Sequence, residues 1–311
     1  MEASWHLSVC ICTYRRPQLL QRLLQALLVQ DLPAHLWQIV VVDNDKAGSA
    51  LAVLQQFQAK FGARLIALHE QRSNISLARN AAINASASPW LAMIDDDELP
   101  APDWLSRLLA CQSAYQADLV FAPVTPEYSP AIPAWIIRGG FFERRRLATG
   151  SVIGHQDART GNVLIRRATL TAISATTVFD PAFGRTGGED SMLFRKIAAY
   201  GAKMIWCDEA AVSEDVPPER ASATWLLQRS YRTGQLYMRT ELAMLHGRRR
   251  YVRALYLSAR AILQAVLASL FAFCLALPKP LAAFHWCRIA ASQIGKISYF
   301  FGRQQVAYGT D

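Results

Sequence analysis

The sequence predicts an α/β fold in which helices cover both faces of a mostly parallel β-sheet. Three observations lead to this prediction. Apolar runs of strand length alternate with segments of helical periodicity through roughly the first 120 residues. Several of these runs are continuous rather than alternating, which is typical of parallel strands buried on both faces. The runs end in polar or acidic residues, and open parallel sheets bind ligands at the carboxyl ends of their strands.

The first strands and helices follow one another at the spacing of βαβ units. Residues 17–30 place six leucines on one helical face, with Pro17 in the first turn, where its missing N–H is tolerated. Residues 39–42 form an uninterrupted apolar run that ends at Asp43. The same reasoning predicts strands at 7–13, 39–42, 65–68, 90–94 and 119–121 and helices at 17–30, 49–61, 76–85 and 102–115.

The second half of the chain is less regular. Prolines gather in residues 123–133, and glycines and arginines gather in 139–154, so both segments are expected to be loops. Beyond them the pattern predicts a strand at 162–166, a glycine-rich turn at 184–190, a helix at 191–200, a strand at 202–207 and helices from 223 onward. We therefore expect one domain over residues 1–235, with halves 1–122 and 123–235, followed by a helical tail at 236–311.

Composition excludes a disordered chain, because 52% of the residues are hydrophobic and only 18% are charged. With 311 residues the chain is also too long for a disulfide-stapled miniprotein. Its six cysteines form no CxxC pair and lack histidine partners at zinc spacing, so we interpret them as reduced thiols in a reducing compartment. Residues 1–7 are mixed in character and run directly into a strand pattern, so no signal peptide is expected.

The net charge of +9 is concentrated in the C-terminal part. Residues 220–311 hold 13 Lys or Arg and 2 Asp or Glu, a net +11, whereas the remainder holds 20 basic and 22 acidic residues, a net −2. A basic tail favours nucleic acid or an anionic membrane as partner, and solvated helix faces are the plain alternative. Because this tail is also very apolar, we favour a membrane over nucleic acid.

Four consecutive carboxylates, Asp95 to Glu98, follow the strand predicted at 90–94. Adjacent carboxylates repel one another, which makes ionisation unfavourable. A hard cation such as Mg²⁺ or Mn²⁺ removes this repulsion, because it takes oxygen ligands, often one or two carboxylates together with substrate phosphates. The alternative is an acidic N-terminus of the helix that begins near Pro102, where the helix dipole stabilises negative charge.

A second acidic cluster follows two glycines. Gly187 and Gly188 let the backbone approach a ligand closely, and a carboxylate of Glu189 or Asp190 could then act as a general base. A helix cap, in which Asp190 accepts hydrogen bonds from the first turn, explains the same pattern without any catalytic role.

Residues 13–16, directly after the first strand, combine an aromatic ring with two guanidinium groups. Such a set can hold a nucleobase or a phosphate, or it can form a solvated turn. Arg79 could pair with a surface acid or reach a diphosphate. No GxGxxG and no Walker lysine motif follows the first strand, which argues against dinucleotide and P-loop sites.

Taken in order, these motifs resemble the inverting family 2 glycosyltransferases. The motifs are VCICTYRRP at 9–17, VVDN at 41–44, ARNAAI at 78–83, IDDDE at 94–98, TGN at 160–162 and GGED at 187–190. Each is weak alone, but their order and spacing over about residues 7–235 are specific. The stretches VPPER at 216–220 and WLLQRS at 225–230, followed by Gly234, are similar to bacterial members that build exopolysaccharide repeat units.

The resemblance implies a GT-A fold, which is a nucleotide-binding αβα sandwich, with a nucleotide-binding half at 1–122 and an acceptor half at 123–235. It also implies residue roles. The nucleotide-binding set would be Thr13, Tyr14, Arg15, Asp43, Arg79 and Asp96, with Tyr14 and Arg15 flanking the base, Asp43 bonded to it and Asp96 on the ribose. The metal ligand would be Asp97, supported by Asp95. Asp190 would be the catalytic base beside Glu189, and Gly161, Asn162 and Gly188 would border the sugar or acceptor.

One departure from the family pattern is Asn74, which stands where the family often has glycine. Asparagine tolerates a positive φ better than most residues, so the turn is expected to survive.

The activity implied by the resemblance is transfer of a sugar from a nucleoside-diphosphate donor, with UDP favoured, to a polysaccharide or lipid-linked oligosaccharide precursor, with Mn²⁺ or Mg²⁺ as cofactor. Two alternatives stay open. One is a membrane-attached nucleotide-sugar binding protein without catalysis. The other is a sugar nucleotidyltransferase, which would normally carry a glycine-rich, lysine-containing loop where residues 13–17 have neither glycine nor lysine.

The tail permits three arrangements. Residues 261–277 are uncharged but reach only about 25 Å as a helix, short of the roughly 30 Å hydrocarbon core. A single span, a re-entrant hairpin or interfacial helix pair, and a soluble helical subdomain or oligomer interface all remain. We expect the second, with the protein on the cytoplasmic face of the inner or plasma membrane and a lipid-linked or polysaccharide acceptor.

Overall fold

The computed structural model describes residues 5–302, which form two compact units. The first unit comprises the chain up to Glu127 together with Arg144–Asp215, and the second comprises Tyr128–Glu143 and the chain from Val216 onward. Each unit is described by itself below.

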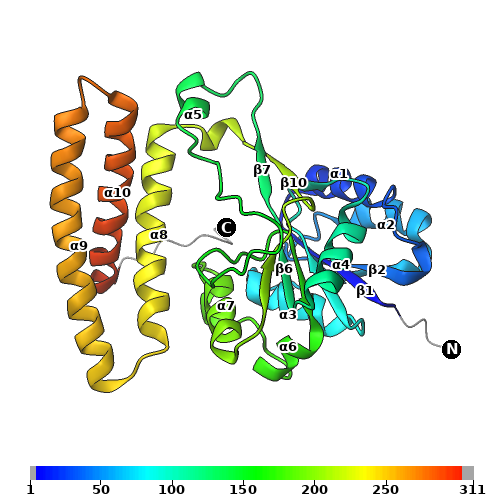
Figure 1. The fold of residues 1–311 in the computed structure, drawn as a ribbon. Helices are drawn as coiled ribbons and strands as arrows, with labels where there is room; N and C mark the ends of the chain where they lie inside the picture. Colours follow the sequence, from blue (N-terminus) through cyan, green and yellow to red (C-terminus); the bar gives the residue numbers. More distant parts are fainter. Residues whose placement is uncertain (1–4, 303–311) are drawn as a thin grey trace. The chain divides into compact units, whose positions relative to one another are not determined.

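The first unit is built on a seven-stranded sheet with the order β3-β2-β1-β4-β8-β6-β9 (Figure 1). All neighbouring strands are parallel except β8, which runs antiparallel to both β4 and β6. The predicted mostly parallel sheet is therefore confirmed. The strands are β1 (Leu7–Thr13), β2 (Trp37–Asp43), β3 (Leu65–His69), β4 (Trp90–Met93), β6 (Leu119–Phe121), β8 (Val163–Arg166) and β9 (Met204–Trp206).

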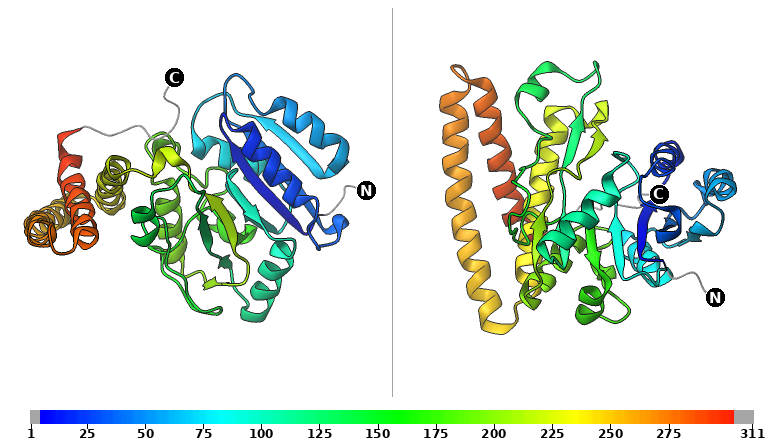
Figure 2. Two further views of the ribbon diagram at one scale, coloured as in Figure 1. Left: turned by 90° about the horizontal axis from the view of Figure 1, so that it is seen from above. Right: turned by 45° about the vertical axis from the view of Figure 1, so that its right-hand side comes forward.

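Helices cover both faces of this sheet, as Figure 2 shows from two further directions. One face packs against α1 (Pro17–Leu27), α2 (Leu51–Phe61) and α4 (Trp104–Tyr115). The other packs against α3 (Ile75–Ala85), α6 (Arg167–Ile173) and α7 (Glu189–Tyr200). Strand β2 lies inside the sheet and is buried along its whole length, which explains why its sequence is a continuous apolar run rather than an alternating one.

A second sheet of three short strands has the order β5-β10-β7. Its strands are β5 (Glu98–Pro100), β10 (Val212–Asp215) and β7 (Val124–Glu127). The expectation that 123–133 is loop throughout is wrong, because β7 pairs in parallel with β10. The described 3-10 helices are η1 (Ala34–Leu36), η2 (Gly62–Arg64), η3 (Pro181–Phe183), η4 (Pro218–Arg220) and η5 (Tyr299–Phe301).

The second unit is helical. It contains α5 (Ala134–Arg138), α8 (Ala223–Ala243), α9 (Gly247–Leu275) and α10 (Pro280–Ser298), and α10 lies between α8 and α9 (Figure 1). By length and composition, α9 is the one helix among residues 5–302 that could cross a bilayer. Its first turn carries three consecutive arginines from Arg248 on.

Helices α8 and α10 meet through two glycines. A Cβ on Gly234 of α8 would overlap the Ser292 carbonyl oxygen, and one on Gly295 of α10 would overlap the Tyr231 carbonyl oxygen. The two backbones therefore touch directly. Glycine is required here for close approach rather than for an unusual φ.

This seam gives a stability prediction. Gly295→Ala should lower the free energy of unfolding by about 1–3 kcal/mol, because the added methyl overlaps backbone atoms that cannot move independently. The measurement is chemical or thermal unfolding followed by circular dichroism. Ser269→Ala, at an exposed position of α9, is the control and should be nearly neutral. Equal stability of the Gly295→Ala protein and the wild type would contradict the packing described here.

Candidate functional site

The carboxyl ends of β1 and β4 are joined by a buried hydrogen bond. Thr13, the last residue of β1, donates its hydroxyl to an Asp96 carboxylate oxygen over 2.7 Å. Asp96 follows β4, the strand that pairs with β1 on the side opposite β2. The threonine thus fixes the acidic turn against the central strand, which places the first of the predicted nucleotide-binding residues beside the acidic run.

Arg16 is the counter-ion of the acidic turn. Its Nη1 lies 3.1 Å from an Asp96 oxygen and 3.0 Å from an Asp97 oxygen. The Asp96 and Asp97 side chains are 6% and 17% exposed, whereas that of Asp95 is 48% exposed. Burial raises the pKa of Asp96 to about 6 even though Arg16 favours its charged form, because the neighbouring Asp97 charge acts in the same direction as burial. Arg16 is one of the two guanidinium groups noted after the first strand, but the sequence did not predict its contact with the acidic turn.

The donor set fits a divalent cation that is shared with a substrate. Among residues 5–302, no three His, Cys, Asp or Glu side chains converge to hold a metal by themselves. Asp97 and Asp95 instead offer carboxylate oxygens that are partly exposed and follow directly on a buried strand. One or two carboxylates completed by phosphate oxygens are the usual way in which Mg²⁺ is bound.

Asp43 organises the turn after β2. One of its carboxylate oxygens accepts from the Asp45 backbone N–H at 3.0 Å and the other from the Ala50 N–H at 2.7 Å. The side chain is buried, and Asn44 beside it donates to the carbonyls of Glu70 and Arg72. Each carboxylate oxygen keeps a second lone pair, so the Asp43 carboxylate can still accept from a ligand.

Tyr14 and Arg15 lie next to this turn. Arg15 adopts a φ of 55°, in the left-handed region, which turns its guanidinium over the Tyr14 ring at 5.0 Å and brings its Nε to 3.1 Å from Asp45. The buried Tyr14 hydroxyl has no hydrogen-bond partner within the described chain. A buried hydroxyl without a partner is uncommon and is consistent with a group that meets a ligand.

Arg79 connects the acidic turn to the GGED motif. From α3, its Nη1 lies 2.6 Å from Glu189 Oε1 and its Nη2 lies 3.6 Å from Asp95 Oδ1. Arg79 and Glu189 are both buried, with side chains 7% and 5% exposed. Burial raises the pKa of Glu189. The positive charge of Arg79 opposes this rise, and the negative charge of the nearby Asp190 adds to it. One guanidinium therefore touches both acidic clusters that the sequence singled out.

Asp190 lies in the first turn of α7, which begins at Glu189 rather than at 191. The preceding glycines have φ values of 85° and 94°, a conformation that an L side chain rarely adopts. The turn made by Gly187 and Gly188 positions Asp190 in the first turn of α7. There its Oδ1 accepts from the Ser191 backbone N–H at 2.6 Å. Its other oxygen is the one that could accept a substrate proton.

Gly161 packs against the same acids. A Cβ at this position would overlap a Glu98 carboxylate oxygen and lie 3.2 Å from an Asp95 oxygen, so a larger residue would have to displace the buried Glu98 carboxylate. Glu98 is fully buried and accepts from the Asp95 backbone N–H at 3.0 Å. Burial and the Asp95 charge raise the pKa of Glu98 well above its usual value. Glu98 is thus a part of the site that the sequence presented only as the fourth acid of a run.

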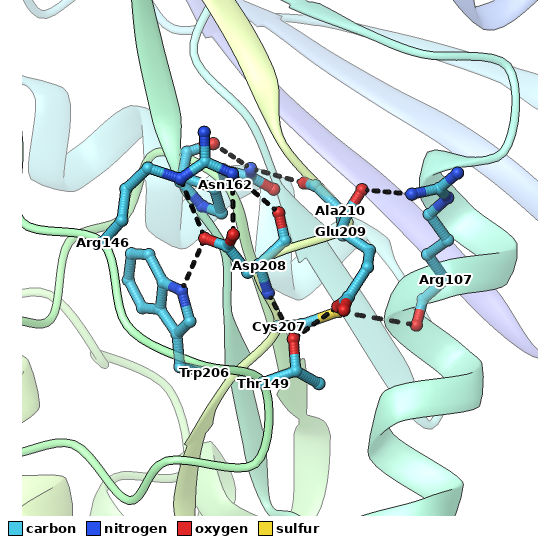
Figure 3. A network of polar contacts seen from close by, with 10 residues as sticks. Arg107, Arg146, Thr149, Asn162, Trp206, Cys207, Asp208, Glu209 and Ala210 are labelled. Atoms are coloured by element: carbon cyan, nitrogen blue, oxygen red, sulfur yellow. Dashed lines mark hydrogen bonds and ion pairs between the residues drawn. The ribbon is translucent and has the colours of Figure 1, made fainter.

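Asn162 is buried next to Gly161 and bonds to three neighbouring segments of the chain (Figure 3). Its side-chain amide donates to the carbonyls of Pro123 and Ala210, both at 2.9 Å, and its oxygen accepts from Trp104 Nε1 at 2.8 Å. Every polar atom of the side chain therefore has a protein partner, and the φ of 57° is of the kind that asparagine tolerates. Asn162 would border a sugar through its backbone and through Gly161.

Part of the loop predicted at 139–154 is held by hydrogen bonds near Asn162 (Figure 3). Arg146 donates to both carboxylate oxygens of Asp208, and Thr149 donates to Glu209. Arg107 of α4 donates to the Glu209 carbonyl oxygen at 2.8 Å. These bonds hold the first unit's loop against the chain that follows β9.

Asn74 does not need the positive φ that the sequence analysis allowed for. Its φ is −156°, and its side chain caps α3 by accepting from the Ser76 and Leu77 N–H groups. The nearby glycine is Gly184, which packs against the Asn74 side chain. A Cβ on Gly184 would overlap the Asn74 side-chain oxygen.

Comparisons with known proteins show the family and the fold of the chain. The model of Glycosyl transferase family 2 matches residues 8–169. The succinoglycan biosynthesis protein ExoM of Rhizobium meliloti is 34% identical over 248 residues, which is 78% of this chain and 78% of that protein. The family resemblance drawn from the motifs is thereby confirmed.

Solved structures agree on the fold. A mannosyltransferase from Pyrobaculum calidifontis, in complex with GDP-Man and Mn²⁺, matches with a TM-score of 0.64 at 18% identity over 97% of this chain and 88% of that one. S. aureus TarS 1–349 in complex with UDP matches with a TM-score of 0.54 at 17% identity over 96% and 92%. The GT-A sandwich is thus the fold of this protein. The chain belongs to glycosyl transferase family 2 and is a glycosyltransferase.

Proposed function

We propose that this glycosyltransferase moves a sugar, with inversion, from a nucleoside-diphosphate donor to a hydroxyl of a polysaccharide or lipid-linked oligosaccharide precursor. The observation that carries the proposal is the Arg79 guanidinium, which contacts Asp95 in the acidic turn and Glu189 beside the candidate base. Donor activation and proton removal must occur within a few ångströms of each other in a single displacement, and these contacts bring the two acidic clusters to one place.

In this proposal Tyr14 and Arg15 flank the nucleobase and Asp43 accepts a hydrogen bond from it. UDP is the favoured donor, because Asp43 and Tyr14 resemble a uracil site in which the carboxylate accepts from the uracil N–H. Thr13 and Asp96 hold the ribose, and Arg79 faces the diphosphate. The exopolysaccharide relative and the UDP complex of the structural neighbour are compatible with this donor.

The chemical step begins when Asp190 accepts the proton of the acceptor hydroxyl. The resulting oxygen attacks the anomeric carbon from the side opposite the diphosphate, and the bond to the diphosphate oxygen breaks. A bound Mn²⁺ or Mg²⁺ at Asp97 and Asp95 would supply positive charge to the departing diphosphate. Gly161, Gly188 and the Asn162 backbone leave room for the sugar, and Glu189 holds Arg79 in place.

We also propose that the enzyme works at the cytoplasmic face of the membrane, where a lipid-linked acceptor is presented. The basic and apolar helices of the second unit support this location, and the sequence relative in succinoglycan biosynthesis is compatible with it. The division into a nucleotide-binding half, an acceptor half and a tail from 236 remains a prediction.

The first test is a panel of UDP-, GDP- and dTDP-sugars with Mn²⁺ or Mg²⁺, read out as released nucleoside diphosphate. With the best donor, Asp190→Asn should lower turnover by about 10²–10⁴-fold, the usual contribution of a general base, and leave donor affinity unchanged. Asp31→Asn, an exposed acid on the same unit, is the matched control. Near-normal turnover of Asp190→Asn would remove Asp190 from the role.

A second test concerns the cation. Asp97→Asn should weaken UDP binding in the presence of Mn²⁺ and leave the affinity measured in EDTA nearly unchanged, because the lost interaction is the one that the cation mediates. Titration calorimetry at both conditions measures this difference, and Asp103→Asn serves as a control acid a few residues away. If wild type and Asp97→Asn gain the same affinity from Mn²⁺, the assignment of Asp97 fails.

A third test concerns the buried ion pair. Arg79→Met leaves Glu189 buried without its counter-ion and should lower the free energy of unfolding by about 3–5 kcal/mol. The double variant Arg79→Met/Glu189→Leu should recover most of this loss but no activity. Urea unfolding of the single and double variants measures both effects. A double variant that is no more stable than Arg79→Met would show that the pair does not act as a unit.

A further inference from the structure

Helix α9 turns mostly small side chains inward and most of its large apolar side chains outward. The buried positions along it are Leu257, Ala261, Ala268 and Ala272, which repeat at the spacing of one helical face. Phe271 stacks on Trp286 of α10, with ring centroids 4.7 Å apart. A further set of large apolar side chains is 43–95% exposed and defines the outer face of α9: Leu255, Tyr256, Ile262, Leu263, Val266, Leu267, Leu270, Phe273 and, just beyond the helix, Leu277.

This distribution is the reverse of what water favours. A helix at the surface of a soluble protein turns its large apolar side chains inward, and a monomer rarely exposes a contiguous apolar patch larger than a few hundred Å². Small residues at helix contacts with large apolar residues outside are instead typical of helices that face lipid.

The neighbouring helices show how such a bundle could meet a bilayer. Helix α8 runs beside α10 and carries charged residues along its length, among them Arg229, Arg239 and Glu241. A hairpin of α9 and α10 that crossed the membrane would take this polar helix with it. Only the outer face of α9, which α10 separates from most of α8, can enter hydrocarbon without burying those charges.

The positive charge of the second unit indicates which partner the outer face of α9 would bind. Residues 242–302 contain eight Lys or Arg and no Asp or Glu. Three of these, Arg248 to Arg250, lie in the first turn of α9, where the helix dipole disfavours positive charge, so local helix stability does not explain them. A second copy of this chain would bring a like-charged face to the first, whereas an anionic lipid surface is complementary.

We propose that the outer face of α9 lies flat in the headgroup–acyl boundary of an anionic bilayer, with Arg248, Arg249 and Arg250 on the acidic headgroups. The proposal deepens the membrane location given above and rests on it, and it assigns a face, an orientation and a lipid charge. It does not depend on the chemistry at Asp190.

The apolar contact is tested by flotation of the purified full-length protein with phosphatidylcholine vesicles that contain phosphatidylglycerol. Val266→Ser/Phe273→Ser, which keeps the net charge, should weaken vesicle binding by at least about 10-fold. The matched control Val29→Ser/Leu51→Ser changes two exposed apolar side chains of the first unit and should bind like the wild type. Equal binding by both double variants would overturn the proposal.

The charge is tested by replacing Arg248, Arg249 and Arg250 with alanine. Binding to anionic vesicles should fall about 5-fold for each arginine, so about 100-fold for the three, and binding to pure phosphatidylcholine should not change. A loss of the same size on both kinds of vesicle would contradict an electrostatic role. A different result would assign the face to a second copy instead. In that case light scattering shows an oligomer of the wild type that becomes monomeric in Val266→Ser/Phe273→Ser, and this variant still floats like the wild type.

The orientation is tested at the turn between α9 and α10. Lys279→Cys, in a Cys274→Ser/Cys287→Ser background, should react with a membrane-impermeant maleimide added outside the vesicles to the bound protein, because a flat hairpin keeps its turn on the side from which it docked. Protection of position 279 would indicate a hairpin that crosses the bilayer. Asp190→Asn should float like the wild type, so failure of the catalytic proposal and failure of this one are distinguishable.

Discussion

The site depends on the ion pair between Arg79 and Glu189, because this pair holds together two parts of the chain that are both acidic. Asp95, Asp96 and Asp97 follow one strand, and Glu189 begins a helix 110 residues from Arg79. Carboxylates at such density repel one another, and burial makes the repulsion stronger because water no longer screens it. Two arginines, Arg16 and Arg79, supply the positive charge that the structure itself places against them.

This balance of charge also explains why a cation belongs to the proposed reaction. A nucleoside diphosphate brings further negative charge to a turn that is already acidic, so two arginines alone would leave the complex strongly negative. Arg16 lies 3.0 Å from Asp97 and its side chain is 38% exposed, so the positive charge that offsets Asp97 lies partly in solvent.

Sequence reasoning predicted the large sheet and most of its helices, because parallel strands buried on both faces leave continuous apolar runs and α1 carries a leucine stripe. It predicted no helix at α6, which is only seven residues long. It failed for the small sheet. The strands β5, β7 and β10 are three or four residues long, mix buried with exposed positions, and include Pro126 in a segment whose prolines indicated a loop. It also presented Arg16 and Glu98 only as members of motifs, since their importance comes from partners that the fold supplies: Arg16 meets Asp96 and Asp97, and Gly161 packs against Glu98.

The sequence also could not decide how the C-terminal helices meet a membrane. Composition marked the tail as basic and apolar, but alanine and leucine contribute alike to an apolar segment, so the sequence alone left a span, an interfacial pair and a soluble bundle open. What separates them is which apolar residues face the neighbouring helix. In α9 three alanines and Leu257 do, and most of the other large apolar side chains face outward, while a charged α8 lies along the other side of α10. A soluble bundle would reverse that assignment, and a spanning hairpin would need α8 to be apolar, so the packing favours a helix that lies on a lipid surface.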